Sequence, residues 1–161
     1  MIHSVMASRV RRTVGAEEGA TMVEFAMASI ILFTLVFGVI EICLALYSYN
    51  VTAEAAREAT RYAIVRGSAC SPSTFSDCNV TSAQLQTYVQ GLGFPGINPS
   101  SLTATATWPT TGSACFPSVT PCNNPGNRVN VTVQYTFPLA IPFVPSQTLT
   151  MSSTSGMSIS Q

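Results

Sequence analysis

The stretch Gly19-Ala20-Thr21-Met22-Val23-Glu24-Phe25 decides how the rest of this chain is organised. From Phe25 the sequence stays apolar to about Tyr47, which is long enough for a membrane-spanning helix, since roughly 20 apolar residues are needed. Glu24 stands at the start of this run, where a carboxylate costs up to about 2.5–3.5 kcal/mol if it enters the lipid. We therefore expect Glu24 to have a partner.

The charges of the chain lie almost entirely in its first half. The 161 residues predict one modest domain beside the apolar segment, and a net charge of zero without any lysine argues against nucleic acid as a partner. Three arginines precede the apolar run, at positions 9, 11 and 12. By the positive-inside rule they keep the N-terminal end in the cytoplasm and send the remainder across the membrane.

The five cysteines divide into one and four. Cys43 lies inside the apolar run and is interpreted as an apolar helix residue. The other four lie in loop-like sequence beyond it, which predicts two disulfides in an oxidising compartment. We favour Cys70–Cys78 and Cys115–Cys122 because each pair closes a short loop. A metal site is disfavoured, since there is no CxxC spacing and the only histidine is near the N-terminus.

The helix is expected to continue beyond the membrane. The segment 50–65 contains no proline or glycine, and Gly67 is a natural stop. Small and apolar residues recur there at three- and four-residue spacing and form one stripe, at Val51, Ala55, Ala59, Tyr62 and Ala63. We predict one helix from about Ala20 to Arg66, preceded by a leader, 1–19, without fixed structure.

The distal region changes to a period of two. It contains all ten prolines, and its alternating apolar residues predict three antiparallel strands with one apolar face, around 102–108, 129–137 and 149–159. Thr81 or Ser82 is expected to cap a short helix that runs to Val89. The fold class is therefore α+β, one long helix packed on a small sheet of about three strands. The apolar connection 139–145 is either exposed or tucked under the sheet.

No catalytic constellation is present in the sequence, so we expect neither an enzyme nor a cofactor. A hydrolytic triad lacks its histidine in the distal region, paired carboxylates are missing there, and there is no Gly-rich phosphate loop.

Three features combine near the N-terminus: a short charged leader that ends in Gly19, a carboxylate at the fifth position after it, and a helix that is first membranous and then amphipathic. Together they resemble the class III signal sequences of type IV pilin-like proteins. The runs 22–26 and 55–63 are similar, more closely, to the TadE-like family of minor pilins, or pseudopilins, of the tight-adherence (Tad/Flp, type IVc) pilus. Phe25 stands where that motif commonly has tyrosine, and it retains the aromatic ring.

This resemblance implies a pilin-like fold and a division of the chain into three parts. Residues 1–19 would be a cleaved cytoplasmic leader, 20–48 a transmembrane and assembly helix, and 49–161 an extracytoplasmic head. The head would include the amphipathic second half of the helix, 49–67, and a β-rich region, 68–161. The chain would cross the bacterial inner membrane once, with its N-terminus in the cytoplasm.

The same resemblance implies the partners. A prepilin peptidase would recognise Glu24 and Phe25 and cut between Gly19 and Ala20; Gly15 is the rival position, but it would put Ala20 at the fifth place. In a filament, Glu24 would pair with the new α-amine of a neighbouring subunit. The other partners would be pilin and pseudopilin subunits, the inner-membrane assembly platform and the lipid bilayer.

Two other functions are open at this stage. One is a permanently anchored, single-span binding or adhesion protein, and the other is an enzyme that uses cysteine chemistry, which would need four free thiols. The alternative to the pairing of Glu24 is that its carboxylate stays hydrated and unpaired at the headgroup level. Glu41, which faces about 100° away from Glu24 around the helix, lies either at the outer membrane interface or against another subunit.

Overall fold

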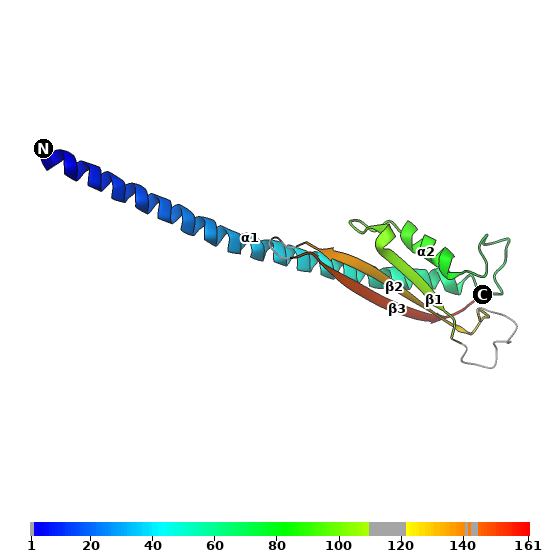
Figure 1. The fold of residues 1–161 in the computed structure, drawn as a ribbon. Coiled ribbons are helices and arrows are strands. Elements are labelled where there is room, and N and C mark those ends of the chain that lie inside the picture. The colour runs from blue at the N-terminus through cyan, green and yellow to red at the C-terminus, as the bar shows by residue number, and fades with distance from the viewer. Residues whose placement is uncertain (1, 110–121, 141, 143–144) are drawn as a thin grey trace. The chain divides into compact units, whose positions relative to one another are not determined.

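The computed structural model describes residues 2–109, 122–140, 142 and 145–161, with the backbone alone for 2–18. Helix α1 (Ile2–Ile64) is followed by α2 (Ser82–Gly91), the 3-10 turn η1 (Pro99–Ser101) and strands β1 (Leu102–Thr107), β2 (Arg128–Leu139) and β3 (Gln147–Ser158) (Figure 1). The chain forms two compact units. The N-terminal unit is Met1–Ile42 with Ala140–Pro145, and the sheet unit is Cys43–Leu139 with Ser146–Gln161.

The sheet has the order β1-β2-β3, and both pairings are antiparallel. Leu102 of β1 lies opposite Tyr135 of β2, and Thr107 lies opposite Asn130. Alternate residues of β1 and β2 are buried, as the period of two predicts. The three expected strands and the α+β arrangement are therefore confirmed.

The second half of α1 forms the core together with this sheet (Figure 1). Its buried positions recur every three or four residues, at Ser48, Val51, Thr52, Ala55, Ala56, Ala59, Thr60 and Ala63. Alanines and hydroxyl residues allow the sheet to approach the helix closely, and Thr60 Oγ1 lies 3.3 Å from the carbonyl oxygen of Ser155 in β3. The apolar stripe predicted on this segment is confirmed, with Tyr62 half-buried at its margin.

Helix α2 begins at the predicted cap. The side chain of Thr81 accepts a hydrogen bond from the backbone N–H of Gln84, and the Gln84 side chain accepts one from the backbone N–H of Thr81. This capping box satisfies two backbone donors that a helix start otherwise leaves unpaired. Leu85 and Val89 of α2 are completely buried in the core.

Two expectations from the sequence are wrong, one about the start of α1 and one about the burial of Leu149. Helix α1 begins at Ile2, not near Ala20. Once a helix is nucleated, each further residue adds one backbone hydrogen bond at little entropic cost, and 2–19 contains no proline to interrupt it. Leu149, expected on the apolar face, is 49% exposed. It lies opposite Phe137, beyond the last β1 pair at Tyr135, so only two strands continue at this level.

Candidate functional site

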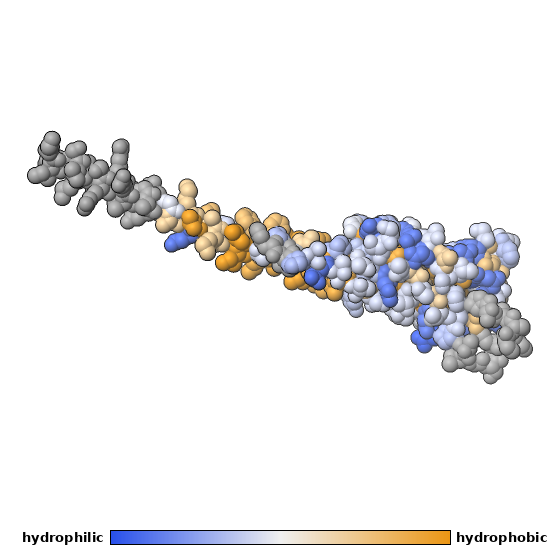
Figure 2. Space-filling model, in the orientation of Figure 1, coloured by the Kyte–Doolittle hydropathy of each residue, from blue (hydrophilic) through white to orange (hydrophobic). Residues whose placement is uncertain are grey.

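A band of exposed apolar side chains surrounds α1 between Met22 and Leu46. It is the orange region of the helix in Figure 2. Within the described residues, Gly19–Ile64 is the one helical segment long and apolar enough to span a membrane, and its most apolar window has no buried residue. Because each large apolar side chain gains roughly 1.5–3 kcal/mol on leaving water, this band requires lipid or protein around it.

Glu24 lies at the N-terminal end of this band with its side chain exposed. No hydrogen bond or ion pair within the described part of the chain engages its carboxylate. Gly19 and Ala20 are exposed as well, and Phe25 is 76% exposed. The structure therefore leaves the predicted cleavage and recognition residues accessible together on one stretch of helix.

Glu41 differs from Glu24 in being partly buried. Its Oε2 atom is buried and has no hydrogen-bond partner among the residues that the structure describes. The thiol of Cys43, close by on the helix, is free and exposed. No cluster of three or more metal-binding side chains is found in the described ranges.

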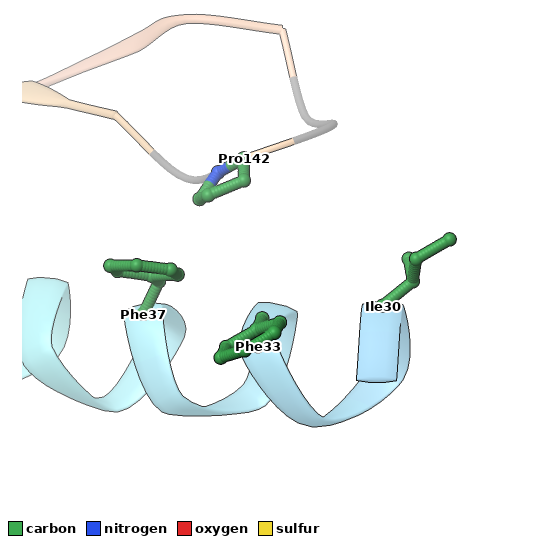
Figure 3. Close-up of a pocket in the computed structure, with 4 residues that line it drawn as sticks. All are labelled: Ile30, Phe33, Phe37 and Pro142. Carbon is green, nitrogen blue, oxygen red and sulfur yellow. The ribbon is translucent and has the colours of Figure 1, made fainter. Parts of the chain in front are cut away.

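A pocket of about 400 Å³ lies on this helix within the N-terminal unit. Its walls are the side chains of Ile30, Phe33 and Phe37 and the ring of Pro142 from the connection between β2 and β3. Figure 3 shows the proline ring facing the two phenylalanines. At Pro142 the connection therefore faces the apolar part of α1. The sequence did not reveal this pocket, because no local pattern brings residue 142 back to residue 33.

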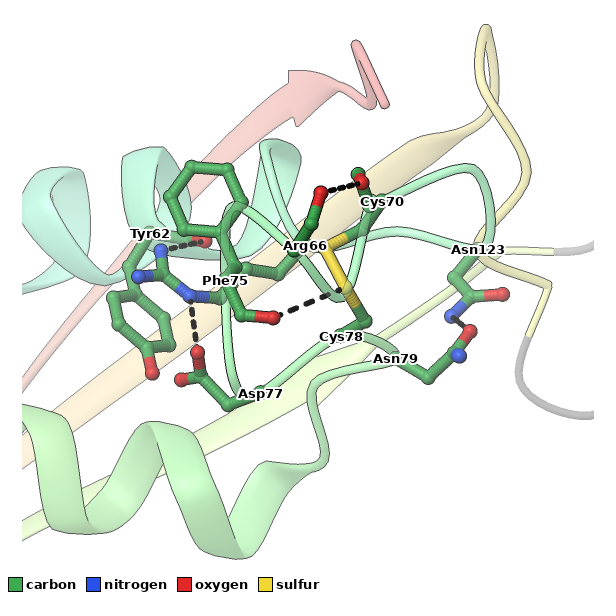
Figure 4. Close-up of a disulfide and its surroundings, with 10 residues drawn as sticks. Tyr62, Arg66, Cys70, Phe75, Asp77, Cys78, Asn79 and Asn123 are labelled. Carbon is green, nitrogen blue, oxygen red and sulfur yellow. Dashed lines mark hydrogen bonds and ion pairs between the residues drawn. A yellow bond between two sulfur atoms is a disulfide. The ribbon is translucent and has the colours of Figure 1, made fainter.

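Arg66 organises the loop that follows α1, and sequence reasoning missed it. Its guanidinium lies 3.6 Å from the ring centre of Tyr62 and 4.7 Å from that of Phe75, and Nε donates to Asp77 Oδ1 at 3.0 Å (Figure 4). Burial lowers the pKa of Arg66 from its usual value, and the nearby Tyr88 opposes this effect. The cationic side chain thus joins a tyrosine ring of α1 to a phenylalanine ring and a carboxylate of the loop that follows.

Cys70 and Cys78 form a disulfide beside this cluster, with their Cα atoms 5.5 Å apart (Figure 4). Cys122 is also disulfide-bonded, and its expected partner, Cys115, lies outside the described residues. Glu54–Arg57 and Glu58–Arg61 form surface ion pairs on α1, at 2.6 and 2.9 Å. Pairs as exposed as these contribute little to stability.

The comparisons with known proteins agree with the N-terminal motif. No curated protein and no solved structure matches the chain. Residues 19–61, however, match the model of a family described as TadE-like protein. This segment begins at Gly19, contains Glu24 and Phe25, and ends in the part of α1 that packs on the sheet. The resemblance inferred from the sequence is therefore confirmed over residues 19–61, which are similar to this family.

Proposed function

We propose that this chain is a minor pilin, or pseudopilin, which helps to assemble a tight-adherence type IV pilus. Its precursor is held in the bacterial inner membrane by the apolar half of α1, and a prepilin peptidase cuts it between Gly19 and Ala20. The proposal is supported most by one observation: the TadE-like match begins at Gly19 and includes Glu24, whose carboxylate has no partner among the described residues and stands at the start of an exposed apolar helix.

Cleavage would create the positive charge that Glu24 lacks. The new α-amine of Ala20 on a neighbouring subunit supplies one cation for one carboxylate. At a separation of 4 Å and an effective dielectric constant of about 20, such a pair gains about 4 kcal/mol. This gain is similar to the cost of about 2.5–3.5 kcal/mol for a charge deep in the membrane, so pairing makes the buried carboxylate tolerable inside a bundle of helices.

The apolar band then exchanges lipid for protein. In the filament, the helices of neighbouring subunits surround Met22–Leu46, and the head, 49–161, faces outward. A structural role of this kind needs no catalytic group and no cofactor. The folded α+β head favours a minor subunit, because major subunits of the Flp kind are typically tiny and lack a head.

Glu24→Gln tests the pairing step, because it keeps the size of the side chain and removes its charge. The matched control is Glu54→Gln, which removes a carboxylate from an exposed ion pair on the same helix. We expect both variants to enter the membrane, and Glu24→Gln to be at least tenfold depleted from filaments sheared off cells. Tenfold corresponds to about 1.4 kcal/mol. Equal recovery of the two variants in filaments would refute the pairing role.

A further inference from the structure

We propose that the free edge of β3 is a docking site for one extended strand of a different, membrane-anchored subunit, which joins the sheet beside β3. The strand that fits this edge is uncharged, and its apolar residues alternate with polar ones. The inference rests on the proposed function in one respect, namely that the partner is another subunit anchored in the same membrane.

The other edge of the sheet, that of β1, is closed by side chains of α2. The Ser82 hydroxyl accepts a hydrogen bond from the N–H of Ala106 at 3.2 Å and donates to its carbonyl oxygen at 3.3 Å. Gln86 accepts from the N–H of Ala104 and donates to the carbonyl oxygen of Leu102 at 2.6 Å. These backbone groups point away from β2, and α2 occupies the place of a further strand beside β1.

The same bonds determine which backbone groups of β3 face outward. Residues of an antiparallel pair alternate between those that bond to the neighbouring strand and those that point away from it. Because Ala104 points away from β2, its partner Val133 points toward β3 and bonds with Ser153. Ile159, six residues after Ser153, keeps this alternation, since its N–H donates to the carbonyl oxygen of Asn127 at 2.7 Å. The residues of β3 that face the free edge are therefore Thr148, Thr150, Ser152 and Thr154.

This free edge has none of the usual protection. Within the described part of the chain, no hydrogen bond engages the outward N–H and carbonyl groups of these four residues, and their side chains are exposed. Strand β3 pairs with β2 over 12 residues without a bulge, and it contains no charge and no proline. Natural edge strands usually carry such features, because an open edge binds other strands. A long unprotected edge therefore indicates strand addition, in which backbone hydrogen bonds supply affinity.

Leu149 indicates which face of the added strand is apolar. Its side chain is 49% exposed, although it shares a face of β3 with the buried Met151. Side chains directly opposite each other on neighbouring strands lie roughly 4.5–5.5 Å apart. An apolar residue of the added strand on this face would therefore cover Leu149.

A second copy of this chain does not fit the edge. Strand β3 and the second half of α1 run in the same direction, because Thr60 contacts Ser155 and Ile64 bonds to Ser160 (Figure 1). Antiparallel pairing of two β3 strands would reverse this half of α1 in one copy, whereas both copies leave the same side of one membrane. Parallel pairing about a twofold axis would put the two Leu149 side chains on opposite faces. Pairing with β1 of another copy is blocked by α2, so a different chain supplies the strand.

Ser152→Pro tests the edge, because it removes an outward N–H without removing a bond to β2. The matched control is Thr136→Pro, since Thr136 is also exposed but lies on β2, beyond the last residue that pairs with β1. We expect Ser152→Pro to be depleted roughly tenfold or more from sheared filaments relative to the control, which corresponds to about 1.4 kcal/mol. Equal recovery would overturn the docking site and leave the proposed function standing.

Should Ser152→Pro fail to fold, Ser152→Lys places a charge at the edge and keeps every backbone group. Its recovery in filaments is compared with that of Thr136→Lys. The same depletion is expected, and equal recovery would again overturn the inference.

Hydrogen exchange tests the edge without relying on filaments. The unchanged chain is extracted with its partners from host membranes in mild detergent and compared with the chain produced alone. We expect the amides of Thr150, Ser152 and Thr154 to exchange roughly tenfold more slowly in the extract, while that of Ser153, which bonds to β2, changes little. Equal rates for the outward amides would overturn the inference. If these amides are protected but residues 1–19 remain on the chain, the proposed function fails and the docking site stands.

A photoreactive benzoylphenylalanine in place of Ser152 identifies the occupant in cells. We expect an adduct with a different chain that has its own membrane-spanning helix. An adduct with a second copy of this chain, or with a protein that lacks such a helix, would overturn the choice of partner.

Discussion

Replacing Gly67 by alanine should destabilise the sheet unit, because the space beside its Cα atom is already filled. A Cβ atom there would lie 2.5 Å from the carbonyl oxygen of Asn123, 2.6 Å from Cγ2 of Ile159, and closer still to the carbonyl oxygen of Gln161. Cβ atoms essentially never approach other heavy atoms to less than 3.0 Å. The substitution therefore requires three neighbours to move.

Two of these neighbours are held by backbone hydrogen bonds. The carbonyl oxygen of Asn123 accepts from the N–H of Ser68 at 3.0 Å, and the N–H of Gln161 donates to the carbonyl oxygen of Ile64 at 3.3 Å. Overpacking against such fixed atoms typically costs about 1–3 kcal/mol. For a domain of 60–100 residues, each kcal/mol lowers the Tm by about 4–8 °C. We therefore expect the Tm to fall by about 4–24 °C.

The assay is thermal unfolding of the full chain in detergent micelles, followed by the fluorescence of its single tryptophan. Gly91→Ala is the matched control, because nothing lies within 4 Å of a Cβ atom at this last residue of α2. Its Tm should stay constant or rise slightly, since alanine narrows the unfolded ensemble. Equal Tm values for the two variants would refute the close packing of Asn123 and the segment 159–161 around Gly67.

Two further predictions concern the free energy of unfolding, measured with urea by the same fluorescence. Thr60→Val should lower the free energy of unfolding by about 0.5–1.5 kcal/mol more than Thr52→Val does. Both hydroxyls donate to a backbone carbonyl of α1, but that of Thr60 also lies within reach of the carbonyl oxygen of Ser155 in β3. Equal losses would show that this bond between α1 and β3 contributes nothing. The double variant Cys70→Ser, Cys78→Ser should lose about 2–3 kcal/mol, the loop-entropy value for a short loop, and a loss below about 0.5 kcal/mol would contradict a stabilising role for the disulfide.

The elements that could be predicted from the sequence are those fixed by local spacing. The period of two between 129 and 137 placed a strand whose apolar residues are all buried. The spacing from Val51 to Ala63 placed the helix face that packs on it. Thr81 and Gln84, three residues apart, marked the start of α2. In each case the interaction joins residues close in sequence, so the pattern could be recognised without knowing the fold.

The features that could not be predicted depend on residues far apart in the chain or on the limits of the sheet. Pro142 forms a pocket with Phe33, and no periodicity links these two positions. Arg66 contacts the ring of Tyr62 in α1 and also Phe75 and Asp77 inside the disulfide loop, although its sequence context suggests only a charge at a helix end. The exposure of Leu149 follows from where β1 stops, which the alternation of β3 does not encode.

The N-terminal sequence of the mature protein is the measurement that tests the central claim most directly. The protein is purified from cell membranes with and without an active prepilin peptidase, and each sample is sequenced from its amino end. We predict that the chain begins at Ala20 where the peptidase is active and retains residues 1–19 where it is not. A chain that retains its arginine-bearing leader in both samples would contradict the assignment as a pilus subunit and favour a permanently anchored protein.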